Sequence, residues 1–146
     1  MSSRSGNAFG AASTLVAQMG ILLGMIVSNQ PQAALVVASA ASAVSGSFGD
    51  AFSMFVSESI DSRNTDAFIT ATSVLVTKLV IGAVYVILFF TLGNSPYLVI
   101  PAAILLTLIL LYFVSDSIKT MIQYTILTIL VVCITSGLGV LIKQSL

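Results

Sequence analysis

Three side chains that can coordinate a metal ion recur at every fourth position in one apolar stretch of the chain. Asp50, Met54 and Glu58 are four residues apart, so on a helix they lie one above the other on a single face. Carboxylate oxygens bind hard divalent cations, and a thioether adds a preference for softer transition metals. The hydroxyls of Ser53 and Ser57 lie beside this row. The pattern indicates a site for a ferrous-like ion whose remaining ligands come from other helices or a second subunit.

The composition places this row in a membrane protein. Hydrophobic residues make up 58% of the 146 residues and charged residues only 7%, whereas a soluble domain usually carries about a quarter charged residues. A chain with so few charges cannot cover a water-facing surface, but a bilayer removes that requirement. The formal net charge is zero and the sequence has no basic cluster, so we expect no nucleic-acid partner.

The sequence lacks the residues that several kinds of catalytic and cofactor sites require. The sequence has no histidine, which excludes histidine-ligated zinc and histidine general bases. Its single cysteine, Cys133, lies in an apolar run, where an inert buried thiol is expected. No sequence motif pairs a nucleophile with a base or forms a glycine-rich phosphate loop. We therefore expect neither an enzyme nor a protein with a prosthetic group.

Five apolar segments separated by short polar stretches predict an all-α integral membrane protein with five transmembrane helices. The expected spans, within a single transmembrane domain covering residues 1–146, are 11–28, 33–58, 67–92, 97–115 and 121–142. The span 33–58 is rich in alanine, serine and glycine, which allow helix backbones to approach closely. We therefore expect it to be the central helix. The most charged connection, 59–66, is expected to be the one substantial polar loop.

The distribution of basic residues predicts the orientation in the bilayer. Five spans place the two termini on opposite sides, and positively charged residues favour the cytoplasmic side. Arg4, Arg63 and Lys119 fall on one side and Lys143 on the other. We therefore expect a multi-pass membrane protein whose N-terminus and 59–66 connection are cytoplasmic.

Asp50 is the residue whose position most needs an explanation. It lies about eight residues inside its span, roughly 12 Å from Glu58 along the helix. A carboxylate at such a depth costs roughly 2.5–3.5 kcal/mol on insertion scales, so it needs a cationic partner, a water-filled cavity or a bound ion. Lys78 lies about twelve residues into the antiparallel third span, at a similar depth. An Asp50–Lys78 pair can be structural and fix helix register, or it can be a switch in which a metal cation displaces the ammonium.

Simpler interpretations are available for the other members of the row. Methionine is a common gap-filler in packed interiors, so Met54 by itself can be ordinary packing. Glu58 lies at the expected end of its span, where an acidic residue needs no special function. Asp61 and Asp66 could attract cations to a pore mouth, but a solvated turn that also carries Arg63 is the simpler interpretation.

The run Ser53-Met54-Phe-Val-Ser-Glu58 resembles the second-span motif of the vacuolar iron transporter family, a Ser-Met followed four residues later by Glu. The layout is similar too, with a glycine-containing first span, a small-residue second span, a polar break and three more spans. The resemblance implies a five-helix bundle that dimerises, with a metal path at the subunit interface lined by the first two helices. It also implies export of ferrous iron, and often manganese, from the cytosol in exchange for protons. Met54 and Glu58 match the family's methionine and glutamate.

The chain departs from the family pattern at two places. The family's first span opens with an Asp-Gly, whereas Phe9 precedes Gly10 here and the nearest polar residue is Asn7. Asp50, at a position where many members have a small residue, is a hypothetical substitute for the missing carboxylate. The 59–66 connection is also too short for the glutamate-rich cytosolic metal-binding domain of many members, so the resemblance is to a short form that lacks it.

These observations favour a homodimeric transporter in a lipid bilayer that moves Fe²⁺ or Mn²⁺ out of the cytosol. The expected transport path is Asp50, Met54 and Glu58, with Asp61, Lys78, Ser53 and Ser57 as accessory residues. Two alternatives remain. One is a non-transporting membrane interaction protein with a structural Asp50–Lys78 pair, and the other is a transporter of another small cation, for which Met54 would be dispensable.

Overall fold

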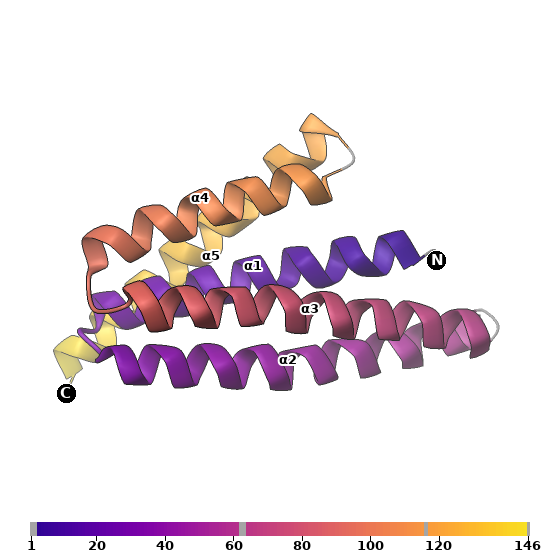
Figure 1. Cartoon of the computed structure of the whole chain (residues 1–146), viewed down its shortest axis with the longest axis horizontal. Helices are drawn as coiled ribbons and strands as arrows, with labels where there is room; N and C mark the ends of the chain where they lie inside the picture. The colour runs from indigo at the N-terminus through magenta and orange to yellow at the C-terminus, as the bar shows by residue number, and fades with distance from the viewer. Residues whose placement is uncertain (1–2, 62–63, 116, 146) are drawn as a thin grey trace.

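The computed structural model describes the backbone of residues 3–61, 64–115 and 117–145, and the side chains in these ranges except those of residues 3–5, 61, 64 and 65. Within these ranges every regular element is an α-helix (Figure 1). The helices are α1 Ser3–Val27, α2 Gln32–Asp61, α3 Asn64–Leu92, α4 Pro96–Val114 and α5 Ile118–Ser145. All five contain a stretch long and apolar enough to cross a membrane. The fold is therefore a helical bundle compatible with a multi-pass membrane protein.

The first three helices extend beyond the apolar segments that predict them. α1 begins at Ser3, before the predicted span 11–28. α2 continues to Asp61, and α3 already begins at Asn64. The expectation of a polar loop over 59–66 is therefore wrong for most of its length, although residues 62–63 lie outside the described part. Hydropathy marks where a chain can face lipid, whereas a helix continues as long as its backbone hydrogen bonds do.

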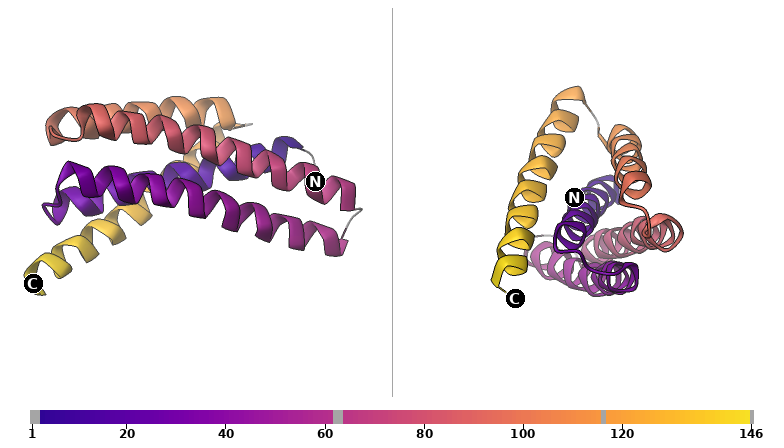
Figure 2. Two further views of the ribbon diagram at one scale, coloured as in Figure 1. Left: turned by 60° about the horizontal axis from the view of Figure 1, so that its bottom comes forward. Right: turned by 90° about the vertical axis from the view of Figure 1, so that its left-hand side faces the viewer.

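The central helix is α1. It packs against all four other helices, whereas α2 packs only against α1 and α3 within the described residues (Figure 2). The prediction that the 33–58 span is central is therefore wrong. Many of the small residues that suggested it lie on the outer face of α2, where they form an exposed small-residue stripe. This stripe consists of Ala41, Ser45, Gly49, Ser53 and Ser57.

Close backbone approaches join the first three helices. α2 and α3 lie side by side along most of their length (Figures 1 and 2). A Cβ atom on Gly82 of α3 would lie 2.5 Å from the Cβ of Ala43 on α2. At Gly6 and Gly10 of α1, a Cβ would lie 3.0 Å from backbone carbonyl oxygens of α3. Glycine at these positions therefore allows α3 to approach both neighbours more closely than any other residue would.

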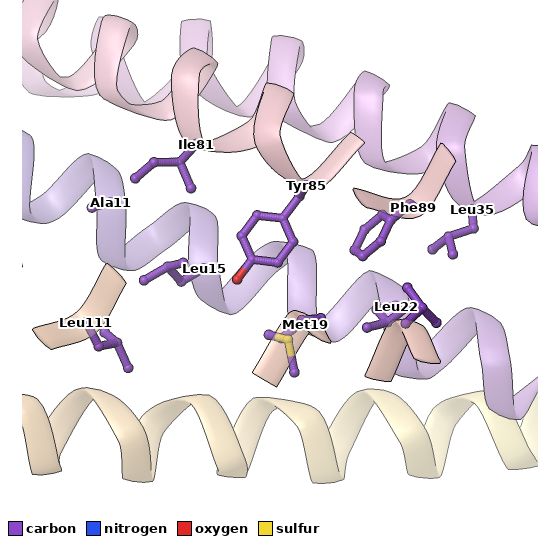
Figure 3. Close-up of a cluster of buried hydrophobic side chains, with 11 residues drawn as sticks. Ala11, Leu15, Met19, Leu22, Leu35, Ile81, Tyr85, Phe89 and Leu111 are labelled. Atoms are coloured by element: carbon purple, nitrogen blue, oxygen red, sulfur yellow. The ribbon is translucent and has the colours of Figure 1, made fainter. Parts of the chain in front are cut away.

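The apolar core lies around the C-terminal half of α3, where it meets α1 and α4 (Figure 3). Tyr85 and Phe89 are fully buried there, with ring centroids 5.7 Å apart in an edge-to-face arrangement. The Tyr85 hydroxyl lies 2.6 Å from Oγ1 of Thr107 on α4, so a hydrogen bond joins the two helices inside the core. This pairing satisfies the one polar atom that such a buried tyrosine brings with it.

The turn between α1 and α2 and a side-chain contact from Gln32 close the bundle at the C-terminal end of α3. Asn29, in the turn between α1 and α2, has a φ of 56°, a left-handed conformation that commonly ends helices. Gln32 at the start of α2 reaches across to α3, and its Nε2 donates to the carbonyl oxygens of Phe89 (2.9 Å) and Phe90 (2.7 Å). The last carbonyls of a helix have no partner within it, so Gln32 caps α3 from a neighbouring helix.

α5 is the most exposed helix of the bundle. It packs mainly against α1 and only sparsely against α4 (Figure 2). Cys133 lies on its exposed surface, so the expectation of a buried thiol is wrong. In a membrane protein an apolar run is as compatible with a lipid-facing surface as with a core, because lipid chains are as apolar as the side chains.

Candidate cation site

The site is centred on an ion pair between α2 and α3. Nζ of Lys78 lies 2.5 Å from Oδ2 of Asp50. The same ammonium donates a second hydrogen bond to Oγ of Ser13 on α1, at 3.1 Å. The first three helices therefore all contribute to holding one positive charge. Both charged residues lie within stretches long and apolar enough to span a membrane.

The two members of the pair differ in burial. The Lys78 side chain is 7% exposed and the Asp50 side chain 34% exposed. A buried ammonium needs a counter-charge and hydrogen bonds, because desolvation of an unpaired charge costs several kcal/mol. Asp50 meets this need through one oxygen while about a third of its side chain remains accessible. The carboxylate can therefore accept a second cation from its open side.

Two glycines make room for the lysine side chain. A Cβ atom on Gly46 of α2 would lie 3.6 Å from Nζ of Lys78, and one on Gly10 of α1 would lie 3.4 Å from its Cγ. Gly46 also precedes Asp50 by one helical turn, so it lies on the same face of α2. The Lys78 side chain therefore packs directly against α2 at Gly46, one turn before Asp50.

The residues of the predicted path differ in burial and in their distance from Asp50. Met54 is half-buried and Glu58 is 6% exposed, one and two turns beyond Asp50. Asp50 and Glu58 are about 12 Å apart along the helix axis, so one ion cannot contact both carboxylates. Ser53 and Ser57 are exposed on the small-residue stripe, and the Ser53 hydroxyl donates to a carbonyl oxygen of its own helix at 2.8 Å.

The side chains that the structure describes in one chain do not form a complete set of metal ligands. Asp61 ends α2, and its side chain lies outside the described part of the structure. Among the described side chains, no three histidine, cysteine, aspartate or glutamate residues are grouped so that they could hold a metal ion. An ion bound at Asp50 would therefore need the Met54 thioether, backbone or hydroxyl oxygens, or ligands from a second copy of the chain.

Sequence reasoning assigned no residue of α1 to this site. Besides Ser13, this helix places Asn7 3.0 Å from the Thr77 hydroxyl. Gln18 of α1 also forms two hydrogen bonds with Ser39 of α2. Its Nε2 donates to the Ser39 carbonyl oxygen at 3.2 Å, and its Oε1 accepts a hydrogen bond from the Ser39 hydroxyl at 2.5 Å. Small or polar residues at positions 7, 10, 14 and 18 repeat at helical spacing, and this signal could have indicated a polar face on α1.

No protein-family model, no curated protein and no solved structure matches this chain. What the chain does must therefore be inferred from its own residues, beginning with the Lys78–Asp50 pair.

Proposed function

We propose that the chain is a transporter that moves a divalent transition metal, Fe²⁺ or Mn²⁺, out of the cytosol. The observation that carries this proposal is a partly exposed carboxylate, Asp50, within an apolar helix long enough to span a membrane. Ionisable residues in such positions are costly and usually mark ion or proton pathways. The resemblance of the run from Ser53 to Glu58 to the motif of vacuolar iron transporters supports the choice of metal.

In the proposed mechanism the Lys78 ammonium stays paired with the Asp50 carboxylate until a metal ion displaces it. The ion enters from the cytoplasmic side past Glu58 and Asp61 and reaches the open side of Asp50. The lysine then keeps its hydrogen bond to Ser13, which is already 3.1 Å away. Met54, one turn from Asp50, adds a thioether that favours a transition metal over magnesium or calcium. Protonation of the carboxylates on the far side releases the ion.

The transporter is proposed to work as a homodimer. Asp50 and Met54 of one chain are too few ligands for a divalent ion, so a second copy would complete the shell with the same two groups. The exposed small-residue stripe on α2 supports this arrangement, because small residues let helix backbones approach closely in a bilayer. At Gly49, an added Cβ would meet nothing within 4 Å in the single chain, so this position is open to a partner helix.

Transport can be tested with a variant that removes both charges together. Asp50→Asn/Lys78→Met leaves no unpaired charge, so it should fold, but it lacks the carboxylate that binds the ion. We expect wild-type protein in liposomes to take up Fe²⁺ and Mn²⁺, and the double variant to show only the uptake of protein-free liposomes. Asp66→Asn is the matched control, because Asp66 is an exposed carboxylate in the first turn of α3, away from the pair. Wild-type uptake by a folded double variant would exclude this mechanism.

A second candidate is a non-transporting membrane interaction protein in which Asp50–Lys78 is a structural pair. The 2.5 Å separation and the additional hydrogen bond to Ser13 favour it, because both fit a permanent contact between helices. Melting curves distinguish the two. A ligand at about 100 times its dissociation constant stabilises the folded state by roughly 2.7 kcal/mol, so added Mn²⁺ should raise the melting temperature of a transporter. The structural candidate predicts no shift and no uptake by the wild-type protein.

A further inference from the structure

A cavity of about 240 Å³ lies between α1, α4 and α5. α4 and α5 contact each other only sparsely and diverge along their length, with α1 between them (Figure 2). All three helices contribute to the cavity wall, which includes Met19, Leu23, Leu108, Leu111, Thr128 and Val132. This cavity is separate from the Asp50–Lys78 pair, since none of its lining residues belongs to α2 or α3.

The wall of the cavity is apolar even where threonines line it. Thr107, Thr125 and Thr128 each donate their hydroxyl to the carbonyl oxygen four residues earlier in the same helix, at 2.7–2.8 Å. Within the described part of the chain, no polar atom is accessible in the cavity. A buried water needs about two to four polar partners, so this space suits hydrocarbon and not water.

The cavity is continuous with the outer surface of the bundle. Ile104, Leu108 and Ile129 line it and are also 43%, 44% and 57% exposed. The lining residues of α4 lie roughly 12–22 Å from Pro96 along the helix axis. The hydrocarbon core of a bilayer is about 30 Å thick, so these residues lie at the depth of lipid tails, away from the headgroups.

We propose that this cavity binds one acyl chain of a membrane phospholipid. The chain enters sideways between α4 and α5 and lies against α1, where it supplies the dispersion contacts that the two helices do not make with each other. Recognition depends on the tail alone, because no charged side chain is among the residues that line the cavity. The site stabilises the packing of α5, the most exposed helix of the bundle.

The test is photolabelling in liposomes made of phosphatidylcholine, with a small fraction carrying a diazirine near the middle of one acyl chain. We expect residues 104–111 and 125–132 to be labelled severalfold more than the exposed α3 side chains Val80, Val84 and Ile87, because a held chain stays beside the cavity residues only. Thr128→Phe fills the cavity from α5 and should reduce this labelling to the level of the exposed α3 side chains. Ile134→Phe, on the exposed surface of α5 outside the cavity, is the matched control and should leave it unchanged.

Folding of each variant is checked by circular dichroism and gel filtration. If Thr128→Phe does not fold, Leu108→Phe fills the same cavity from α4. Equal labelling of all exposed surfaces in the wild-type protein would overturn the proposal, since it indicates general contact with lipid only. Undiminished labelling at residues 104–111 in a folded cavity-filling variant would overturn it as well.

Discussion

Lys78 and Asp50 form an ion pair in which the cation is far more deeply buried than the anion. Their atoms lie 2.5 Å apart, yet the lysine side chain is 7% exposed and the aspartate side chain 34% exposed. The lysine reaches this position because Gly10 and Gly46 leave room beside it, and because Ser13 accepts its second hydrogen bond. The pair therefore presents a carboxylate, and not an ammonium, to the outside of the helix bundle.

The difference in burial predicts unequal effects of removing the two charges. Asp50→Asn leaves a buried ammonium without a counter-charge, whereas Lys78→Met leaves a carboxylate whose side chain is already 34% exposed at the surface of the bundle. Breaking a buried ion pair costs about 3–5 kcal/mol, and we expect Asp50→Asn at the upper end of this range and Lys78→Met at or below its lower end. Thermal melting in detergent measures both, and the double variant should melt near the wild-type temperature. Equal losses in the two single variants would contradict the asymmetry.

The close contact of α2 and α3 predicts that Gly82 cannot be replaced. A methyl group at Gly82 would lie 2.5 Å from the Cβ of Ala43, so Gly82→Ala must separate the helices and should lower the melting temperature. Gly137→Ala on the exposed surface of α5 is the matched control, because a Cβ there meets nothing within 4 Å. Alanine is favoured over glycine in helices by about 1 kcal/mol, so the control should be neutral or slightly stabilising. A melting temperature for Gly82→Ala equal to that of Gly137→Ala would show that the approach is not tight.

The small-residue stripe on α2 predicts the dimer interface. Gly49→Phe places a large ring in the middle of the stripe without disturbing contacts within one chain, so it should shift dimers towards monomers. Counting photobleaching steps of labelled protein in liposomes measures this shift. Ile134→Phe on the exposed surface of α5 should leave the subunit count unchanged. A wild-type protein that is already monomeric would rule out this interface.

The capping contact of Gln32 predicts a stabilising role for a residue with no place in the proposed transport path. Its Nε2 donates to two carbonyl oxygens at the end of α3, at 2.7 and 2.9 Å. Gln32→Ala removes both hydrogen bonds and should cost about 1–3 kcal/mol. Gln30→Ala, an exposed amide in the same turn, is the control and should cost little. Equal melting temperatures for the two variants would mean that the cap contributes nothing.

The five long apolar helices and the Asp50–Lys78 ion pair could be predicted from the sequence. Apolar segments interrupted by short polar stretches identify spans because lipid cannot satisfy backbone polar groups, so each segment must be helical. Asp50 and Lys78 could be paired because a charge at that depth needs a partner, and the two residues lie at similar depths on consecutive antiparallel helices. The metal ligands and the dimer remain predictions, since they concern groups that one chain does not bring together.

The packing of the helices could not be predicted in the same way. The small residues of α2 suggested a central helix, yet five of them form a stripe on its exposed face, and α1 occupies the centre. The sequence by itself determined which segments are long and apolar enough to span a bilayer and which charges would need a partner there, because both depend on local hydropathy and on position along the segment. Only the tertiary structure decided that Ser13 joins the pair and that Asp50 stays partly open, because these depend on which helix faces meet when all five pack together.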